Sequence, residues 1–231
     1  MKITNVPRTL AIIPDGNRRW SRSHKLSILS GYSQGVSKFI EFSEWCAVYG
    51  INSISVWALS TENFKRNSKE VDALFRIYKR VALDRNVIDR LHSNKTRLNI
   101  VGNKKLLPKD LRDSLHRVEL ETKKYSDKVI NMLIGYGGRD DLMSAARSIA
   151  KKFPKGNVTE EEFGNFLISR SIPEIDFVIR TSGEKRLSGF MPWQAGYAEL
   201  YFSKKLWPDF TRNDLHAALV DYSNRQRRFG R

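Results

Sequence analysis

Short apolar runs rich in β-branched residues recur along the chain, and stretches with helical periodicity separate most of them. These runs, which we predict to be strands, are Leu10–Ile13, Ser53–Leu59, Arg97–Val101, Val129–Ile134, Asp176–Ile179 and Glu199–Phe202. Strands that alternate with helices favour an α/β fold, in which helices cover both faces of a mostly parallel central sheet. Because no repeat, low-complexity tract or linker divides the sequence, we expect a single domain over residues 1–231.

Apolar periodicity and capping signals locate the helices between these strands. Apolar faces are formed by Val36, Phe39, Ile40 and Ala47, by Val71, Leu74, Phe75, Tyr78 and Ala82, by Leu111, Leu115 and Val118, and by Leu142, Ala145, Ala146 and Ile149. Thr159 and Glu162 have the spacing of a capping box, so we expect a fifth helix to begin there. Thr211 is the expected N-cap of the last helix.

Polar clusters follow four of the predicted strands. They are Asp15-Gly-Asn-Arg-Arg-Trp20, Ser60-Thr-Glu-Asn-Phe-Lys-Arg66, Gly135-Tyr-Gly-Gly-Arg-Asp140 and Arg180-Thr-Ser-Gly-Glu-Lys-Arg-Leu-Ser188. The carboxyl ends of parallel strands are where open α/β sheets bind ligands. A carboxylate, glycines, hydroxyls and guanidinium groups suit a metal-bound phosphate. Each cluster alone is also compatible with an ordinary exposed loop or turn.

The charge balance indicates an anionic partner. Forty-one Lys and Arg residues against 25 Asp and Glu residues give a net charge of +16, and a charge of that size suits nucleic acid, anionic lipid or phosphorylated substrates. No aromatic RNA-binding signature, Cys/His finger spacing or basic region joined to heptads is found, so we expect no nucleic-acid partner. The single cysteine, Cys46, excludes an internal disulfide and fits a reducing compartment.

The chain has no sequence signal for export or for a membrane span. Residues 1–7 lack the apolar core of a signal peptide, and no apolar run is long enough to cross a bilayer. We therefore expect a cytoplasmic protein that contacts a membrane peripherally at most.

Seven blocks of sequence resemble the cis-prenyltransferases of the undecaprenyl diphosphate synthase type. In the order and spacing of that family they are 12–20, 60–64, 135–139, 179–186, 193–202, 207–210 and 225–230. The Asp-Asp-x-x-Asp motif of the all-helical trans-type synthases does not occur. The resemblance implies a homodimeric α/β fold with a hydrophobic tunnel. It also implies Mg²⁺-dependent condensation of an allylic prenyl diphosphate with isopentenyl diphosphate in the cis configuration, with release of pyrophosphate.

The resemblance also implies roles for individual residues. Asp15 and Glu199 would bind the metal, and Asp15 would act catalytically on the departing diphosphate. Asn63 and Arg66 match positions linked to proton removal from the condensing isoprenoid. The allylic diphosphate would be bound by Gly16, Asn17, Arg18 and Arg19, with Trp20, Ser60 and Glu62 as further substrate-binding residues. The second diphosphate would be bound by Arg180, Arg186 and Ser188, with Arg228 and Gly230 reaching across the dimer.

Two departures from the family pattern keep other functions open. Ile28 stands where the family commonly has a diphosphate-binding arginine, and Tyr32 stands where it has a histidine. Some lavandulyl-type relatives share this tyrosine, so an irregular condensation, with dimethylallyl diphosphate as the nucleophile, is an alternative. A non-catalytic partner subunit is another, although the predicted site residues are intact. Product length depends on the tunnel floor, where Phe75 and Tyr78 are expected to shorten it.

Overall fold

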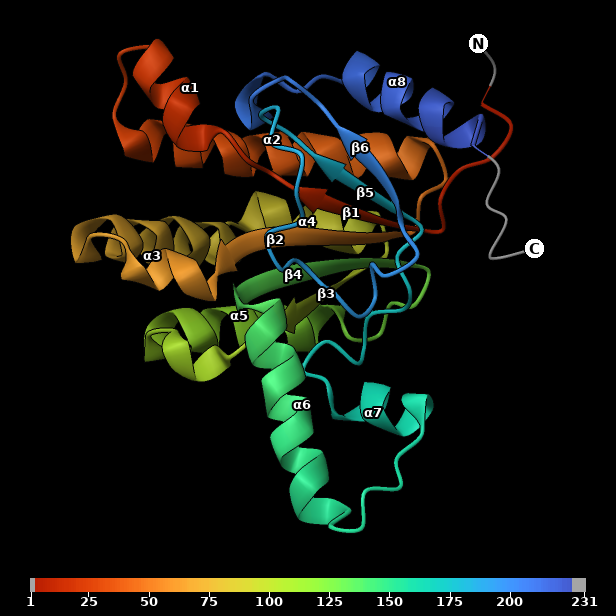
Figure 1. Cartoon of the computed structure of the whole chain (residues 1–231). Coiled ribbons are helices and arrows are strands. Elements are labelled where there is room, and N and C mark those ends of the chain that lie inside the picture. The colour runs from red at the N-terminus through yellow and green to blue at the C-terminus, as the bar shows by residue number, and fades with distance from the viewer. Residues whose placement is uncertain (1–2, 226–231) are drawn as a thin grey trace.

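The computed structural model describes residues 3–225, which form one central sheet with helices around it (Figure 1). The strands are β1 (Thr9–Ile13), β2 (Ser53–Ser60), β3 (Thr96–Val101), β4 (Lys128–Tyr136), β5 (Phe177–Arg180) and β6 (Glu199–Phe202). All pairings are parallel, and the order across the sheet is β3-β4-β2-β1-β5-β6. The six predicted strands are confirmed, and their ends differ from the predicted ends by at most two residues.

Strand β1 lies in the middle of the sheet, and its position determines where a ligand can bind. All five of its residues are buried, as expected for a strand covered on both faces of a parallel sheet. Leu10 pairs with Ile54 of β2 on one side and with Phe177 of β5 on the other. The chain continues from β1 to β2 on one side of β1 and later returns to β5 on the other side. Such a switch point in the strand order opens a crevice at the carboxyl ends of the strands.

The helices agree with the predicted periodicity and add two that the periodicity did not indicate. They are α1 (Asn17–Ser23), α2 (Ile28–Val48), α3 (Ser68–Leu83), α4 (Arg85–Ser93), α5 (Lys109–Thr122), α6 (Gly138–Lys152), α7 (Glu160–Phe166) and α8 (Arg212–Ser223). Thr159 and Thr211 both form capping boxes, with Glu162 and Asp214 respectively. The two helices that the periodicity did not indicate, α1 and α4, are short, and most of their residues are polar or charged.

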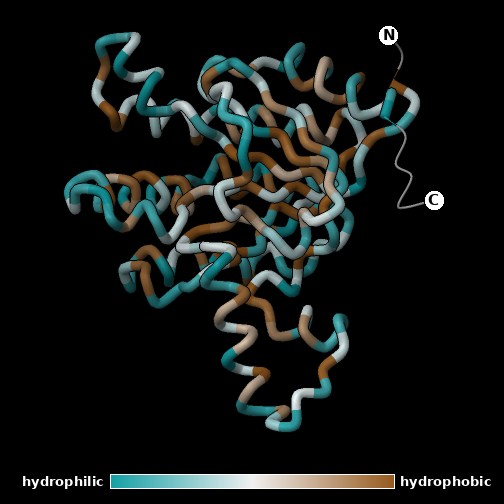
Figure 2. Tube along the Cα trace, viewed as in Figure 1, coloured by the Kyte–Doolittle hydropathy of each residue, from teal (hydrophilic) through white to brown (hydrophobic). Residues whose placement is uncertain are grey.

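The hydrophobic core lies on both sides of the sheet. On one face, α2 and α8 cover β1 and β5, while α3, α4 and α5 cover β3 and β4. On the other face, residues 168–175 and 187–195 pack over β1, β4 and β5. The central strands are accordingly the most hydrophobic part of the trace in Figure 2. Cys46 is completely buried in the same core cluster as the apolar residues of α8.

None of the helices within residues 3–225 combines the length and apolar character that a membrane span requires.

Candidate active site

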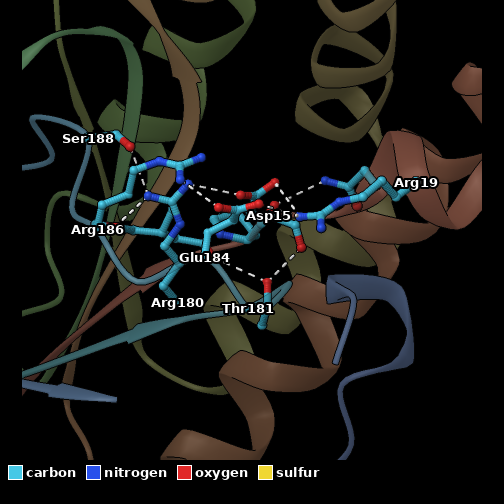
Figure 3. Close-up of polar contacts among 10 residues, drawn as sticks. Asp15, Arg19, Arg180, Thr181, Glu184, Arg186 and Ser188 are labelled. Carbon is cyan, nitrogen blue, oxygen red and sulfur yellow. Dashed lines mark hydrogen bonds and ion pairs between the residues drawn. The ribbon is translucent and has the colours of Figure 1, made fainter. Parts of the chain in front are cut away.

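Asp15 follows the carboxyl end of β1, and its carboxylate faces two arginines (Figure 3). Asp15 Oδ2 accepts a hydrogen bond from Arg180 Nη2 at 2.9 Å, and Asp15 Oδ1 lies 3.9 Å from Arg19 Nη2. The backbone is held from the other side, because the Asp15 carbonyl accepts from Thr181 Oγ1 at 2.7 Å and from the Trp207 amide at 3.0 Å. Asp15 and Arg180 are therefore in direct contact, as predicted.

Arg180 is the most enclosed charge of this group, with only 5% of the residue exposed. Its Nη1 donates to Ser188 Oγ at 2.9 Å and to the backbone carbonyl of Arg186. A buried guanidinium is costly unless it is paired and hydrogen-bonded, so these contacts and Asp15 together fix its direction. Its Nε has no hydrogen-bond partner among the described residues, which leaves one donor available for a bound anion.

Glu184 connects the remaining arginines of the cluster. Its carboxylate pairs with Arg186 Nη1 at 2.5 Å and lies 3.7 Å from Arg19 Nη2 (Figure 3). Arg186 and Arg19 are both about half exposed, so they can turn toward a ligand. Glu184 was not predicted as a site residue, although it stands within the block that contains Arg180 and Arg186.

The turn after Asp15 requires glycine. Gly16 has φ 109°, a left-handed conformation, and a Cβ at this position would meet Leu206 Cδ2 at 2.9 Å. Asn17 then begins α1; its Nδ2 donates to the Pro14 carbonyl at 3.2 Å, and its buried Oδ1 has no partner among residues 3–225. This turn places polar groups at the space beyond the carboxyl end of β1.

That space is the mouth of a cavity of about 1000 Å³, near the upper end of the range usual for ligand pockets. Its charged end is lined by Asp15, Gly16, Asn17, Arg18, Arg19, Arg180 and Ser188. Its inner walls are mostly apolar and include Val36, Phe39, Ile40, Ile54, Val56, Leu74 and Tyr78. The expected hydrophobic cavity is therefore present. Phe75 does not line it, because that ring packs against Phe64 instead.

Trp20, a predicted substrate-binding residue, is not among the residues that line this cavity. Its Nε1 donates to Asp209 Oδ1 at 2.7 Å, and its ring stacks on His24 at a centroid distance of 4.3 Å. Trp20 therefore ties α1 to the 3₁₀ turn at Trp207–Asp209.

A second charged group stands at the cavity mouth and is centred on Glu70. Tyr32 Oη donates to Glu70 Oε1 at 2.5 Å, and Arg66 Nη1 donates to Tyr32 Oη at 2.8 Å. Arg18 Nε lies 3.8 Å from the same carboxylate oxygen. Burial, and then the hydrogen bond to Glu70, raise the pKa of Tyr32 well above its usual range, so its hydroxyl remains protonated. No sequence signal singled out Glu70, although it lies in the first turn of α3, four residues after Arg66, whose Nη1 is 3.4 Å from its carboxylate.

Ser60 and Asn63 form a capping box that closes the 3₁₀ turn at Thr61–Lys65. The Asn63 amide donates to Ser60 Oγ at 3.3 Å, and the Ser60 amide donates to Asn63 Oδ1 at 3.1 Å. Ser60, Glu62, Asn63 and Arg66 nevertheless all line the cavity. The Asn63 Nδ2 group remains available to a ligand, because the cap uses only its oxygen and backbone amide.

Glu199 does not join Asp15 within one chain. It pairs with Phe177, which pairs with Leu10, so it lies at the start of β6, whereas Asp15 follows the end of β1. The step from Leu10 to Ile13 alone spans about 10 Å. The Glu199 carboxylate instead binds Arg225 Nη1 at 2.7 Å. Within one chain the parallel register therefore puts the two carboxylates at opposite ends of the strands, and the metal role predicted for Glu199 stays a prediction.

The donor set at Asp15 fits a Mg²⁺ ion that arrives with a diphosphate. Within residues 3–225, no group of three or more His, Cys, Asp or Glu side chains could hold a metal on its own. Mg²⁺ is commonly held by one or two carboxylates together with substrate phosphates and water. Asp15 commits one oxygen to Arg180 and keeps the other at the cavity mouth, which supplies one such carboxylate. Arg228 and Gly230 lie outside the described residues.

Guanidinium groups stand at the mouth of a long apolar cavity. This arrangement suits a class of enzyme that acts on amphiphiles with an anionic head and an apolar tail. Prenyl diphosphates have this structure. The comparisons with known proteins agree with this class. Residues 13–230 match the family model for undecaprenyl diphosphate synthases. The chain belongs to this family of cis-prenyltransferases.

Named relatives and solved structures cover nearly the whole chain. A tritrans,polycis-undecaprenyl-diphosphate synthase (geranylgeranyl-diphosphate specific) of Thermoplasma volcanium is 39% identical over 97% of this chain and 89% of its own length. Dehydrodolichyl diphosphate synthase 3 of Arabidopsis thaliana is 40% identical over 97% and 76%. Lavandulyl diphosphate synthase from Lavandula x intermedia, solved with dimethylallyl diphosphate, superposes with a TM-score of 0.93 at 35% identity over 98% and 99%. A probable undecaprenyl diphosphate synthase from Campylobacter jejuni gives 0.81 at 32% identity over 99% and 100%.

Proposed function

We propose that the protein condenses an allylic prenyl diphosphate with isopentenyl diphosphate in the cis configuration, releases pyrophosphate and requires Mg²⁺. The observation that carries this proposal is the pairing of Asp15 with the buried Arg180 at the mouth of a long apolar cavity. The name of the Thermoplasma relative, which specifies geranylgeranyl diphosphate, supports an allylic diphosphate as the first substrate.

The allylic substrate would place its diphosphate against residues 16–19 and its tail in the cavity. When the allylic C–O bond breaks, negative charge develops on the departing diphosphate, and Arg19 and the already oriented Arg180 stabilise that charge. A Mg²⁺ ion held by Asp15 would supply Lewis-acid stabilisation of the same oxygens. The apolar walls beside the reacting carbon exclude water, which would otherwise capture the cation.

The second substrate would bind at Arg186 and Ser188, with Arg180 between the two diphosphates. Its double bond attacks the allylic carbon, so that a new C–C bond forms as the C–O bond to diphosphate breaks, and the resulting cation loses a proton. Asn63 and Arg66 would orient the second substrate for this loss of a proton. Because neither an amide nor a guanidinium is a base at neutral pH, we assign proton acceptance to the departing pyrophosphate.

A homodimer remains part of the proposal, with Glu199 acting on a second subunit. β6 is an edge strand of the sheet, and Glu199 at its start is part-exposed. In this arrangement Arg228 and Gly230 would also contribute to the neighbouring site.

Irregular condensation is a second candidate function, and one observation favours it. The superposition on lavandulyl diphosphate synthase, with a TM-score of 0.93, exceeds that on the Campylobacter protein, with 0.81. Tyr32, which occupies the pocket in place of a histidine, is held by Glu70 and Arg66. In this alternative, dimethylallyl diphosphate takes the place of isopentenyl diphosphate as the nucleophile.

One experiment tests both candidates. Purified protein with Mg²⁺ and geranylgeranyl diphosphate is given isopentenyl diphosphate or dimethylallyl diphosphate separately, and the products are identified by mass spectrometry and by double-bond geometry. We expect longer cis products with isopentenyl diphosphate, and none when the metal is chelated. Product formed only with dimethylallyl diphosphate would replace the first function by the second. No product with either nucleophile would contradict both.

A further inference from the structure

One arginine at the cavity mouth has no part in the reaction described above. Arg139, at the second position of α6, lines the cavity together with Gly138, Ser188 and Gly189. The residue is exposed, and its side chain forms no hydrogen bond or ion pair with any other residue in the range 3–225 that the structure describes. Its guanidinium group is therefore available to a ligand.

Most arginines of the cavity differ from Arg139 in this respect. Those that face a carboxylate are Arg18, Arg19, Arg66, Arg90 and Arg180. Among the cavity-lining arginines of the described chain, only Arg22 and Arg139 do not. Arg22 belongs to α1, which follows the proposed allylic site, whereas Arg139 stands next to Ser188 of the proposed second site.

A close contact between two glycines fixes the position of Arg139 beside Ser188. The Gly138 amide donates to the Gly189 carbonyl at 3.1 Å, and a Cβ on Gly138 would lie 2.2 Å from that carbonyl oxygen. Only glycine permits this approach. Because Gly138 precedes Arg139 and Gly189 follows Ser188, the Arg139 side chain begins next to the turn that carries Ser188. The Ser188 hydroxyl in turn accepts from Arg180 at 2.9 Å.

The other neighbour of Arg139 is the 3₁₀ turn that holds Asn63. β2 and β4 are paired up to their carboxyl ends, and α6 leaves the sheet directly after β4 (Figure 1). A Cβ on Gly137 would lie 2.2 Å from Thr61 Oγ1, so the start of α6 also touches this turn. Arg139 therefore begins between Ser188 and the turn of Asn63, where the second substrate would lie.

The charge of Arg139 does not serve the helix that carries it. A cation in the first turn of a helix faces the positive end of the helix dipole, which is unfavourable. Neither acidic residue of this turn pairs with Arg139, because Asp140 is exposed and Asp141 is buried, where it accepts from the Ile168 amide at 2.6 Å. An unpaired cation at an unfavourable helix position, in a cavity suited to anionic heads, indicates a role in binding an anion.

We propose that Arg139 is a further substrate-binding residue and that it binds the diphosphate of the second substrate. This inference rests on the proposed function. Arg180 would stand between the two diphosphates, whereas Arg139 would contact only the second. Its planar guanidinium binds two phosphate oxygens side by side, without competition from a protein carboxylate. Loss of Arg139 should therefore weaken binding of the second substrate and leave that of the allylic substrate unchanged.

Steady-state kinetics of Arg139→Gln test this selectivity. We expect KM for isopentenyl diphosphate to rise about tenfold or more, and KM for geranylgeranyl diphosphate to change less than about twofold. Arg139→Lys keeps the charge but loses the planar fork, so its KM should lie between the two. The matched control is Arg147→Gln, because Arg147 is an exposed arginine of the same helix that does not line the cavity.

Three kinetic outcomes would overturn the proposal. They are an unchanged KM for isopentenyl diphosphate in Arg139→Gln, an equal rise for both diphosphates, and the same rise in Arg147→Gln. Thermal unfolding supplies a readout that a structural role would move. Because the variant removes a cation from the first turn of α6, its Tm should equal or exceed that of the wild type. A Tm that falls together with the affinity would show that Arg139 supports the fold and would reject it as a binding residue.

A binding measurement separates this inference from the proposed function. Wild type and Arg139→Gln are loaded with geranylgeranyl thiodiphosphate, whose C–S bond resists ionisation, and isopentenyl diphosphate is then titrated by calorimetry without turnover. We expect the variant to bind isopentenyl diphosphate about tenfold or more weakly. Equal affinity of the two proteins would reject the role of Arg139 even in an active enzyme. A selective loss of affinity in a protein that transfers no prenyl group would reject the proposed function and leave the role of Arg139 supported.

Discussion

At the scale of single residues, the site depends on one buried guanidinium and the carboxylate that faces it. Arg180 is oriented by Asp15, Ser188 and the Arg186 carbonyl before any ligand arrives. Groups fixed in this way stabilise developing charge without reorganising during the reaction. The fixed orientation of Asp15 and Arg180 is therefore part of the proposed catalysis, and their contact should also contribute to the stability of the fold.

Removal of the Asp15 carboxylate tests that dual role. In Asp15→Ala we expect kcat to fall by about a thousandfold or more, because metal-assisted departure of the diphosphate is lost. The free energy of unfolding should fall by about 1–3 kcal/mol, because the buried Arg180 loses a charged partner. Steady-state prenyl transfer and urea unfolding measure the two effects. Asp209→Ala, which removes only the partner of Trp20, is the control for loss of a nearby carboxylate. A kcat close to that of the wild type would contradict the role of Asp15.

Glu70 is expected to act by positioning its neighbours. Glu70→Gln removes the charge that holds Arg18, Arg66 and Tyr32 together, so we expect kcat/KM for the allylic diphosphate to fall about tenfold to a hundredfold, as for loss of a charge-assisted hydrogen bond of about 1.5–3 kcal/mol. Tyr32→Phe removes only the phenol and should have a smaller effect. If the two variants are equally impaired, Glu70 acts through Tyr32 alone. An unchanged kcat/KM in Glu70→Gln would contradict the assignment.

Sequence information located some of these residues and not others, for physical reasons. Asp15 and Arg180 were predicted to meet because each follows a predicted strand. They are in contact in the structure because β1 and β5 are neighbours in the sheet. Glu199 also belongs to a matched block, but a block does not say at which edge of the sheet its residues lie. Glu70 belongs to no block and was found only from its contacts with Arg66 and Tyr32.

At the scale of elements, apolar periodicity was sufficient for the sheet and most helices. The strands are buried and rich in β-branched residues, and this pattern distinguishes them from the amphipathic helices between them. Apolar periodicity did not indicate helix α1, because its seven residues, Asn17–Ser23, contain one aromatic side chain and no apolar repeat. The helix forms where Gly16 turns the backbone, so tertiary structure decides its position.

The amino-terminal cap of α7 makes the stability of this helix dependent on pH. The Glu162 carboxylate accepts from the Thr159 amide at 2.9 Å and from its hydroxyl at 3.0 Å, and these bonds lower the pKa of Glu162. A carboxyl group with a lowered folded-state pKa stabilises the fold fully above its unfolded pKa, and this contribution is lost as the pH falls through the folded pKa. Acid should therefore weaken the cap.

Comparison of wild type with Glu162→Gln measures this dependence. Thermal unfolding is followed from about pH 7 to about pH 3, and we expect the variant to be less stable at neutral pH. The difference between the two proteins should narrow as the pH falls. A difference that is constant over this range would show that the charge of Glu162 does not stabilise α7.

At the scale of the whole molecule, the proposed homodimer predicts complementation between inactive variants. If each site takes Arg228 from the neighbouring subunit, a mixed dimer of Asp15→Ala and Arg228→Ala contains one site with both defects and one with none. Random reassociation of equal amounts makes half of the dimers mixed, so activity should recover to about a quarter of the wild-type value. The measurement is prenyl transfer before and after subunit exchange. No recovery despite proven exchange would contradict a shared site.

The place of β1 between β2 and β5 also has a consequence for synthesis of the protein. The ribosome synthesises β1, β2, β3 and β4 before β5. These strands and the helices between them provide most of the apolar wall of the cavity. β5, which completes the pairing of β1 and carries Arg180, emerges only near the end of translation. A nascent polypeptide cut short before this strand would therefore retain an unpaired central strand edge, which is prone to aggregation, and would lack Arg180, Arg186 and Ser188.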